Sequence, residues 1–135
     1  MGLFHRLSPS ARDDALAALL ASVADAGGRS ARRYQTATTG DDATLLDVVA
    51  ETAAGLGWGI WTFAQPSRRE LLLDVANSPF AAGFGPSPAP VCAAIAGMVG
   101  AVATTIFGRP TAAKETSCVA AGAECCRFVA RVEAA

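Results

Sequence analysis

Residues 89–107 constrain the fold most, because about five helical turns here carry almost no polar side chain. Pro90 suits the first turn of a helix, and Gly108 and Pro110 end it. A helix that is apolar all round is either buried in protein or spans a membrane. The segment lacks the Leu, Ile and Phe density and the flanking cations of a membrane span, so we expect a buried helix.

The composition fits one domain over residues 1–135, with 52% hydrophobic and only 17% charged residues. Such an apolar chain needs a large interface, an apolar cavity, or both. The net charge of -1, without any run of basic residues, argues against a nucleic-acid partner. Residues 1–12 lack the continuous apolar stretch of a signal peptide. We therefore expect a cytoplasmic protein whose cysteines stay reduced.

Helical spacing of apolar side chains predicts a first helix over residues 8–26, which Gly27 and Gly28 end. A short helical segment follows over residues 29–34. The same spacing predicts another helix over residues 42–56, again followed by glycine.

Alternating apolar and polar side chains over residues 58–65 and 71–75 predict a β-hairpin, and residues 112–121 and 125–132 predict a second one. In the last strand Cys126 points toward the core. Two hairpins and several helices predict an α+β fold in which helices pack on an antiparallel sheet of about four strands.

Residues 77–90 hold four of the seven prolines and two aromatic side chains, Phe80 and Phe84, that we expect to be exposed. A connection of this length without secondary structure is uncommon in a small domain and is usually functional. The segment is therefore a candidate lid over a cavity.

The predicted C-terminal hairpin contains most of the side chains that could bind a metal ion. Its turn places Cys118 roughly opposite Cys125 or Cys126, so two sulfur atoms can share one ion. Glu115 precedes Cys118 on the same strand, and Cys92, near the start of the buried helix, can add a fourth ligand to a tetrahedral zinc ion. Two other interpretations remain open, because free cysteines are often small buried hydrophobes and can also form a disulfide or redox pair.

The same residues form a motif, which reads Glu115-x-x-Cys118, a turn that contains Gly122, and then Cys126-x-Phe128. This motif resembles the 4-vinyl reductase domain family, small hydrocarbon-binding domains that also serve as sensor modules of phenol- and toluene-responsive transcription activators. The resemblance spans residues 42–132. It includes residues 55–59, which lead into the first strand, and the loop at residues 77–80, whereas residues 1–40 match only as generic helices.

The resemblance implies that zinc is held by Cys92, Glu115, Cys118 and Cys126, with Cys125 left out. Three thiolates and a carboxylate fill a tetrahedral site and leave no position for water, which implies a structural and not a catalytic zinc. The resemblance also implies a homodimer, which would cover the excess apolar surface.

An apolar pocket beneath the 77–90 segment is the remaining candidate for a functional site. Nucleophilic catalysis lacks a base, because His5 is the single histidine and lies near the terminus. Phenol sensors of the family place a histidine on the phenol hydroxyl, so a chain without an interior histidine favours a larger or more apolar ligand. The candidate lining residues, with Ala96 and Ala113 implied by the resemblance, are Trp58, Trp61, Phe63, Phe80, Phe84, Ala96, Met98, Phe107 and Ala113.

We therefore predict a stand-alone, zinc-containing domain that binds a small hydrophobic or aromatic molecule as a sensor or carrier and is not an enzyme. Its output would pass through a partner protein or through delivery of the ligand. One alternative is a scaffold subunit that uses its apolar face for protein contacts. A lesser alternative is a protein associated with vinyl reduction of a tetrapyrrole, the activity that the family's name records.

Overall fold

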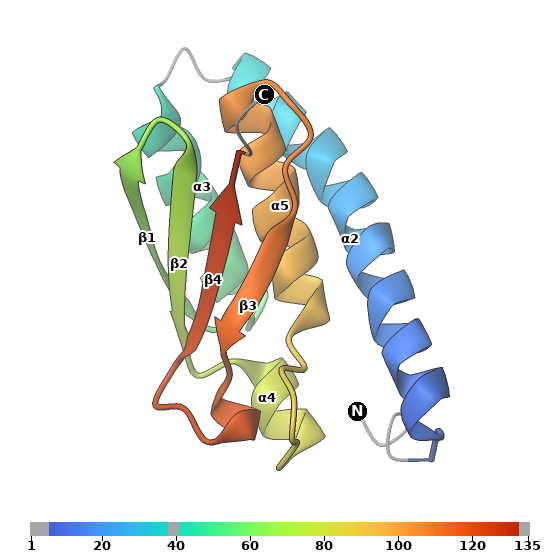
Figure 1. Cartoon of the computed structure of the whole chain (residues 1–135). Coiled ribbons are helices and arrows are strands. Elements are labelled where there is room, and N and C mark those ends of the chain that lie inside the picture. Colours follow the sequence, from blue (N-terminus) through green and yellow to red (C-terminus); the bar gives the residue numbers. More distant parts are fainter. Residues whose placement is uncertain (1–5, 38–40, 133–135) are drawn as a thin grey trace.

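The computed structural model describes residues 6–37 and 41–132, so His5 lies outside the described part (Figure 1). Four strands form one antiparallel sheet in the order β1-β2-β4-β3. Helices α3 and α5 cover one face of this sheet, and α2 packs on α5. The predicted α+β class is confirmed. In chain order the elements are α2 (Pro9–Ala37), α3 (Asp42–Gly55), β1 (Ile60–Ser67), β2 (Glu70–Ala76), α4 (Pro79–Phe84), α5 (Ala93–Phe107), β3 (Ala113–Ser117), the 3-10 helix η1 (Val119–Ala121) and β4 (Cys126–Arg131).

Helix α5 is the buried helix that its apolar sequence predicts. Nine of its fifteen residues are buried, because the sheet covers one side and α2 another. The helix begins at Ala93 and not at Pro90, because Cys92 takes the N-cap position. It ends at Gly108, whose φ of 70° lies in the left-handed region that a side chain disfavours.

Helix α2 is continuous, so the predicted stop at Gly27 and Gly28 and the separate helix over residues 29–34 are wrong. Gly27 allows α2 to pack closely against α5. A Cβ atom on Gly27 would lie 2.6 Å from the sulfur of Met98 and 3.3 Å from the Cβ of Ala101, both on α5. The missing side chain lets the two helices approach each other, and this contact outweighs the low helix propensity of glycine.

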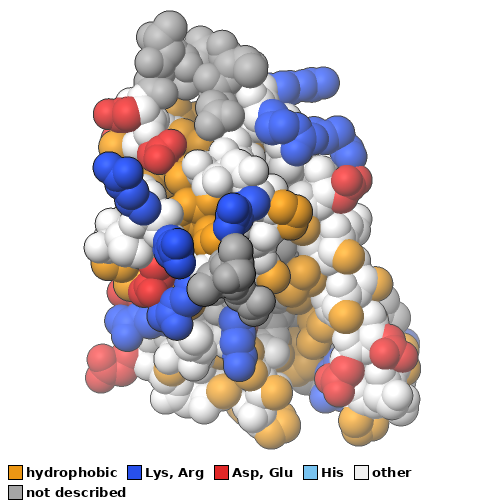
Figure 2. Space-filling view, turned by 45° about the horizontal axis from the view of Figure 1, so that its top comes forward, with side chains coloured by type: hydrophobic (Ala, Val, Ile, Leu, Met, Phe, Trp, Pro, Cys, Tyr) orange, Lys and Arg blue, Asp and Glu red, His pale blue; other side chains and the backbone are white. Residues whose placement is uncertain are grey.

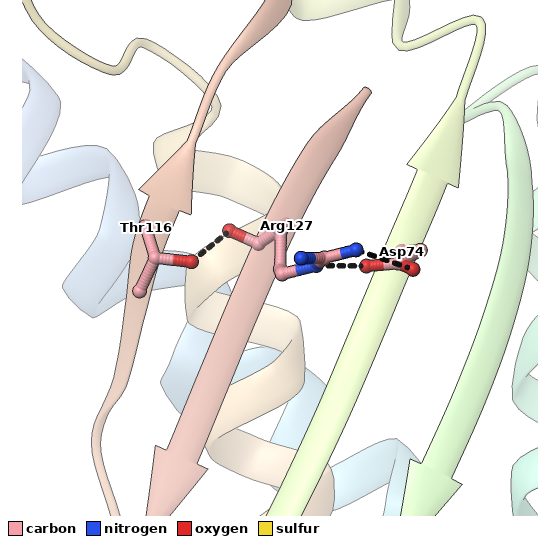
Figure 3. Close-up of polar contacts among 3 residues, drawn as sticks. All are labelled: Asp74, Thr116 and Arg127. Atoms are coloured by element: carbon pink, nitrogen blue, oxygen red, sulfur yellow. Dashed lines mark hydrogen bonds and ion pairs between the residues drawn. The ribbon is translucent and has the colours of Figure 1, made fainter. Parts of the chain in front are cut away.

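The sheet has one buried face and one exposed face. Leu71 and Leu73 on β2 are fully buried against the helices. On the exposed face, Nε and Nη2 of Arg127 on β4 donate to the carboxylate of Asp74 on β2 at 2.7 and 3.2 Å (Figure 3). These hydrogen bonds hold the pKa of Asp74 below its ordinary value. The hydroxyl of Thr116 on β3 donates to the carbonyl of Arg127 at 3.4 Å, so three strands are tied together on this face.

The segment 77–90 contains the short helix α4, where the sequence predicted a long loop. The hydroxyl of Ser78 accepts a hydrogen bond from the backbone N–H of Ala81 at 3.3 Å and caps this helix. Phe84, predicted to be exposed, is only 2% exposed and belongs to the core. The prediction of an irregular lid is therefore wrong for residues 79–84, which form α4.

One end of the molecule, where the β1–β2 turn lies, carries many basic side chains. Figure 2, in which this end is turned toward the viewer, shows Lys and Arg side chains spread over it, with apolar side chains exposed between them. Among the helices of the described residues, none combines the length and the apolar character needed to cross a bilayer.

Candidate functional site

The fold brings together the four side chains that the sequence motif singled out. Cys92 is the N-cap of α5, Glu115 lies on β3, Cys118 precedes η1, and Cys126 is the first residue of β4. One ligand atom from each residue, three sulfurs and a carboxylate oxygen, lies within 4.8 Å of all the others. We call this group the Cys3Glu cluster. Cys125 does not belong to it and is half-buried.

The sulfur spacing in the cluster suits a shared ion better than a disulfide. The Sγ atom of Cys92 lies 3.7 Å from that of Cys126 and 4.0 Å from that of Cys118. A tetrahedral zinc ion with Zn–S bonds of about 2.3 Å separates its sulfur ligands by about 3.8 Å. A disulfide requires about 2.05 Å.

One oxygen of the Glu115 carboxylate accepts a hydrogen bond, and the other has no hydrogen-bond partner. Its Oε1 accepts a hydrogen bond from the backbone N–H of Cys92 at 3.0 Å. Its Oε2 is buried and has no hydrogen-bond partner. A buried oxygen without a partner is costly, and a metal ion would satisfy it. The donor set and this orphaned oxygen both fit zinc.

Two further contacts orient the sulfur atoms. The Ser78 hydroxyl lies 3.2 Å from the Sγ of Cys92, and the backbone N–H of Val119 donates to the Sγ of Cys126 at 3.4 Å. The sequence analysis missed Ser78. Its signal was present, because a serine followed by proline is a common helix start, and here that start lies beside the cluster.

In the absence of metal, the pKa values of the three thiols of the Cys3Glu cluster differ. The hydrogen bond from the Cys92 thiol lowers the pKa of Cys126 to about 7. The same hydrogen bond, together with burial, raises the pKa of Cys92, and burial also raises the pKa of Cys118. Cys126 is thus the first thiol to become a thiolate, the form that binds metals.

We expect Glu115→Gln to stabilise the metal-free protein at neutral pH. Burial raises the pKa of Glu115, so the folded state disfavours its charge, and stability falls as pH rises from the ordinary value of 4.5 through the folded pKa. Glutamine removes this penalty and can still accept from Cys92. Far-UV circular dichroism in the presence of a chelator should show a larger folded fraction for the variant at pH 7 and equal folded fractions well below pH 4.5. A smaller folded fraction for the variant at pH 7 contradicts the assignment.

Three of the predicted pocket residues, Trp58, Trp61 and Met98, lie in the wall of one apolar cavity. Its volume is about 290 Å³, and we call it the tryptophan cavity. None of its wall residues is charged. The remaining wall residues come from α2, α3 and the segment after α3, and are Val23, Ala26, Gly27, Ser30, Val49, Thr52, Ala53 and Leu56.

Ala96 and Ala113 lie in the wall of a different hollow, between α2, α5 and the segment that leads into β3. This small-residue groove has a volume of about 490 Å³. Asp25 and Arg32 give it charged walls, unlike the tryptophan cavity. The other wall residues are Leu20, Ala24, Gly28, Gly97, Gly100, Ala101, Thr104, Pro110, Thr111 and Ala112.

The remaining predicted residues lie outside both hollows. Phe63 shares a separate surface hollow with Trp61. Phe80 packs edge-on against Trp58 with ring centroids 5.1 Å apart, so it supports the tryptophan cavity from behind. Phe84 is core, and Phe107 packs partly buried against the core. The predicted single pocket is therefore wrong, because its residues are divided among three hollows and the core.

The segment that contains the Cys3Glu cluster matches a known protein family. The family model of the 4-vinyl reductase domain matches residues 71–132. The predicted resemblance is confirmed over these residues, and the family model does not extend to residues 42–70, which the prediction had included. This match to the 4-vinyl reductase domain begins in β2 and ends after β4, so it contains all four residues of the Cys3Glu cluster. No curated protein sequence matches the chain significantly.

Two solved structures share the fold of the chain. The phenol-responsive sensory domain of the transcription activator PoxR, solved with phenol, superposes with a TM-score of 0.75 at 20% sequence identity. The match covers 87% of the present chain and 64% of that chain, so the sensory domain is substantially longer. A vinyl-4-reductase family protein from Methanocaldococcus jannaschii gives a TM-score of 0.63 at 15% identity, covering 85% and 68% of the two chains.

Proposed function

We propose that the chain is a zinc-stabilised domain of the 4-vinyl reductase type that binds a small hydrophobic or aromatic molecule in the tryptophan cavity, as a sensor or carrier. The observation that carries this proposal is the cavity itself, which has two indole rings and no charged residue in its wall. Ligand sites are typically concave, mostly apolar and supplied with a few polar groups. The description of the similar PoxR domain as phenol-responsive supports the same class of function.

The cavity wall defines the chemistry of the ligand. Its side-chain hydroxyls belong to Ser30 and Thr52, and the indole N–H of Trp61 already donates to the carbonyl of Trp58 at 3.1 Å. Binding would therefore rest on burial of apolar surface, worth about 25 cal/mol per Å². A cavity of about 150 Å³ holds one benzene ring, so the volume of about 290 Å³ suits two fused rings.

Zinc would be held by the Cys3Glu cluster and would supply a cross-link. The four ligands come from the start of α5, from β3, from the residue before η1 and from the start of β4. With all four positions taken by protein, the ion contributes to folding and offers no position for substrate. Cys92 and Ser78 then fix the junction of α5 with α4.

Naphthalene should raise the Tm of the protein more than phenol does at the same free concentration. The larger apolar area buried gives a lower Kd, and stabilisation grows with ligand concentration over Kd. Differential scanning fluorimetry with an external dye measures both shifts. An equal or larger shift with phenol contradicts the proposed ligand class.

Two variants locate the binding site. Ala26→Phe fills the tryptophan cavity from the exposed side of α2 and should abolish the naphthalene shift. Ala113→Phe fills the small-residue groove and should leave that shift unchanged. The reverse pattern would place the ligand in the groove. Sedimentation of Ala113→Phe tests the predicted homodimer, since a dimer interface at this position predicts a monomer with binding preserved.

A further inference from the structure

Two residues of the Cys3Glu cluster line a cavity between α2 and β3. This α2–β3 cavity has a volume of about 240 Å³. Cys92 and Glu115 form part of its wall, whereas Cys118 and Cys126 do not. The other wall residues are Leu16, Ala17 and Leu20 on α2, Pro90, Ala93 and Ala96 at the start of α5, and Ala113 and Lys114 on β3.

The sulfur atoms are covered on the other sides. The three cysteines of the cluster are at most 1% exposed. Ser78, at the start of α4, contacts the sulfur of Cys92, and the backbone of Val119 in η1 contacts the sulfur of Cys126. An ion that approached from α4 or η1 would have to displace these contacts. On the α2–β3 side, Cys92 and Glu115 themselves form the wall beside the cluster, so an ion that approaches here meets Glu115 and not the Ser78 and Val119 contacts.

Glu115 differs from the other members of the cluster in two ways. Its side chain is half-buried and borders the cavity, and its Oε2 is buried without a hydrogen-bond partner. A carboxylate oxygen also binds zinc less firmly than a thiolate, because zinc is a borderline-soft ion. Glu115 is therefore the ligand that can detach first and still remain anchored at Oε1 by Cys92.

We propose that zinc enters and leaves through the α2–β3 cavity, with Glu115 as the ligand at its opening. The proposal rests on the zinc site of the proposed function. Small side chains keep the route open on the α5 side, at Ala93 and Ala96. Helix α2 forms the outer wall, so the side chains of α2 at this level determine how fast the ion exchanges.

Zinc transfer to the chromogenic chelator 4-(2-pyridylazo)resorcinol, followed by absorbance, tests the route. Ala17→Phe should slow release about tenfold or more, because the ion then waits for a local opening of α2. Ala18→Phe is the matched control, since both alanines are exposed on α2 but only Ala17 lines the cavity. Release from the control should match the original protein.

A second pair of variants tests the opposite change. Leu16→Ala widens the cavity and should speed release several-fold, whereas Leu19→Ala, a half-buried leucine of α2 outside the wall, should not. Elemental analysis of the zinc content comes first. Protein purified without chelator that holds no zinc overturns the metal site and the route with it. Bound zinc with equal release rates in all four variants overturns the route alone.

Discussion

Cys118→Ala is expected to remove the metal and most of the folded population. The unmodified protein, purified without chelator, should carry about one zinc per chain, because a structural zinc site contributes its binding free energy directly to folding. In small zinc domains that contribution is about 10 kcal/mol or more, which matches the whole free energy of unfolding of a typical domain. Elemental analysis and far-UV circular dichroism measure the two losses together.

Cys125→Ser is the matched control for this experiment. Cys125 neighbours Cys126 in sequence but lies outside the Cys3Glu cluster and is half-buried. The serine variant should keep about one zinc per chain and the original Tm. Loss of zinc in Cys125→Ser, or full folding of Cys118→Ala, contradicts the ligand set.

Gly97→Ala is expected to destabilise the fold although it adds one methyl group and raises helix propensity. The added Cβ would lie 2.5 Å from the carbonyl oxygen of Leu20 and 3.1 Å from the backbone nitrogen of Ala24, both on α2. Backbone atoms cannot move aside as a flexible side chain does. We expect a loss of about 2–3 kcal/mol in the free energy of unfolding, or roughly 10 °C in Tm.

Gly55→Ala separates this steric effect from helix propensity. Gly55 is the last residue of α3, and a Cβ there meets no atom within 4 Å. Alanine should be neutral or stabilise the protein by up to about 1 kcal/mol. Chemical denaturation of both variants measures the difference, and a Gly97→Ala protein as stable as Gly55→Ala would show that α2 does not pack as closely as described.

The candidate metal centre was predictable because its geometry is mostly local. Glu115, Cys118 and Cys126 lie on one hairpin, and the register shift between Glu115 and Ser117, just before β3 ends, lets Cys118 join Glu115 and Cys126 on one side although it is three residues from Glu115. Cys92 was predicted as a fourth ligand from its place near the start of the buried helix, and its N-cap position required the structure. The helix α2 was predicted to stop because glycine costs about 1 kcal/mol in a helix, and no local pattern reports that Gly27 faces Met98.

The cavities were only partly predictable for a related physical reason. Whether an aromatic ring lines a cavity or fills the core depends on what packs against it from distant parts of the chain. Trp58 and Trp61 line a hollow whose other walls come from α2, α3 and Met98 of α5. Phe84 has similar chemistry but is enclosed. Sequence periodicity gives the side of an element that is buried, and the shape of the space on that side is a tertiary property.

The adjacent pair Cys125 and Cys126 gives strand β4 a choice of pairing register. A slip of one residue would carry the sulfur of Cys125 toward the metal position and would also turn Phe128 and Ala130, both fully buried, out to solvent. Zinc by itself cannot tell one thiolate from the other. The apolar alternation of β4 therefore selects which thiolate coordinates.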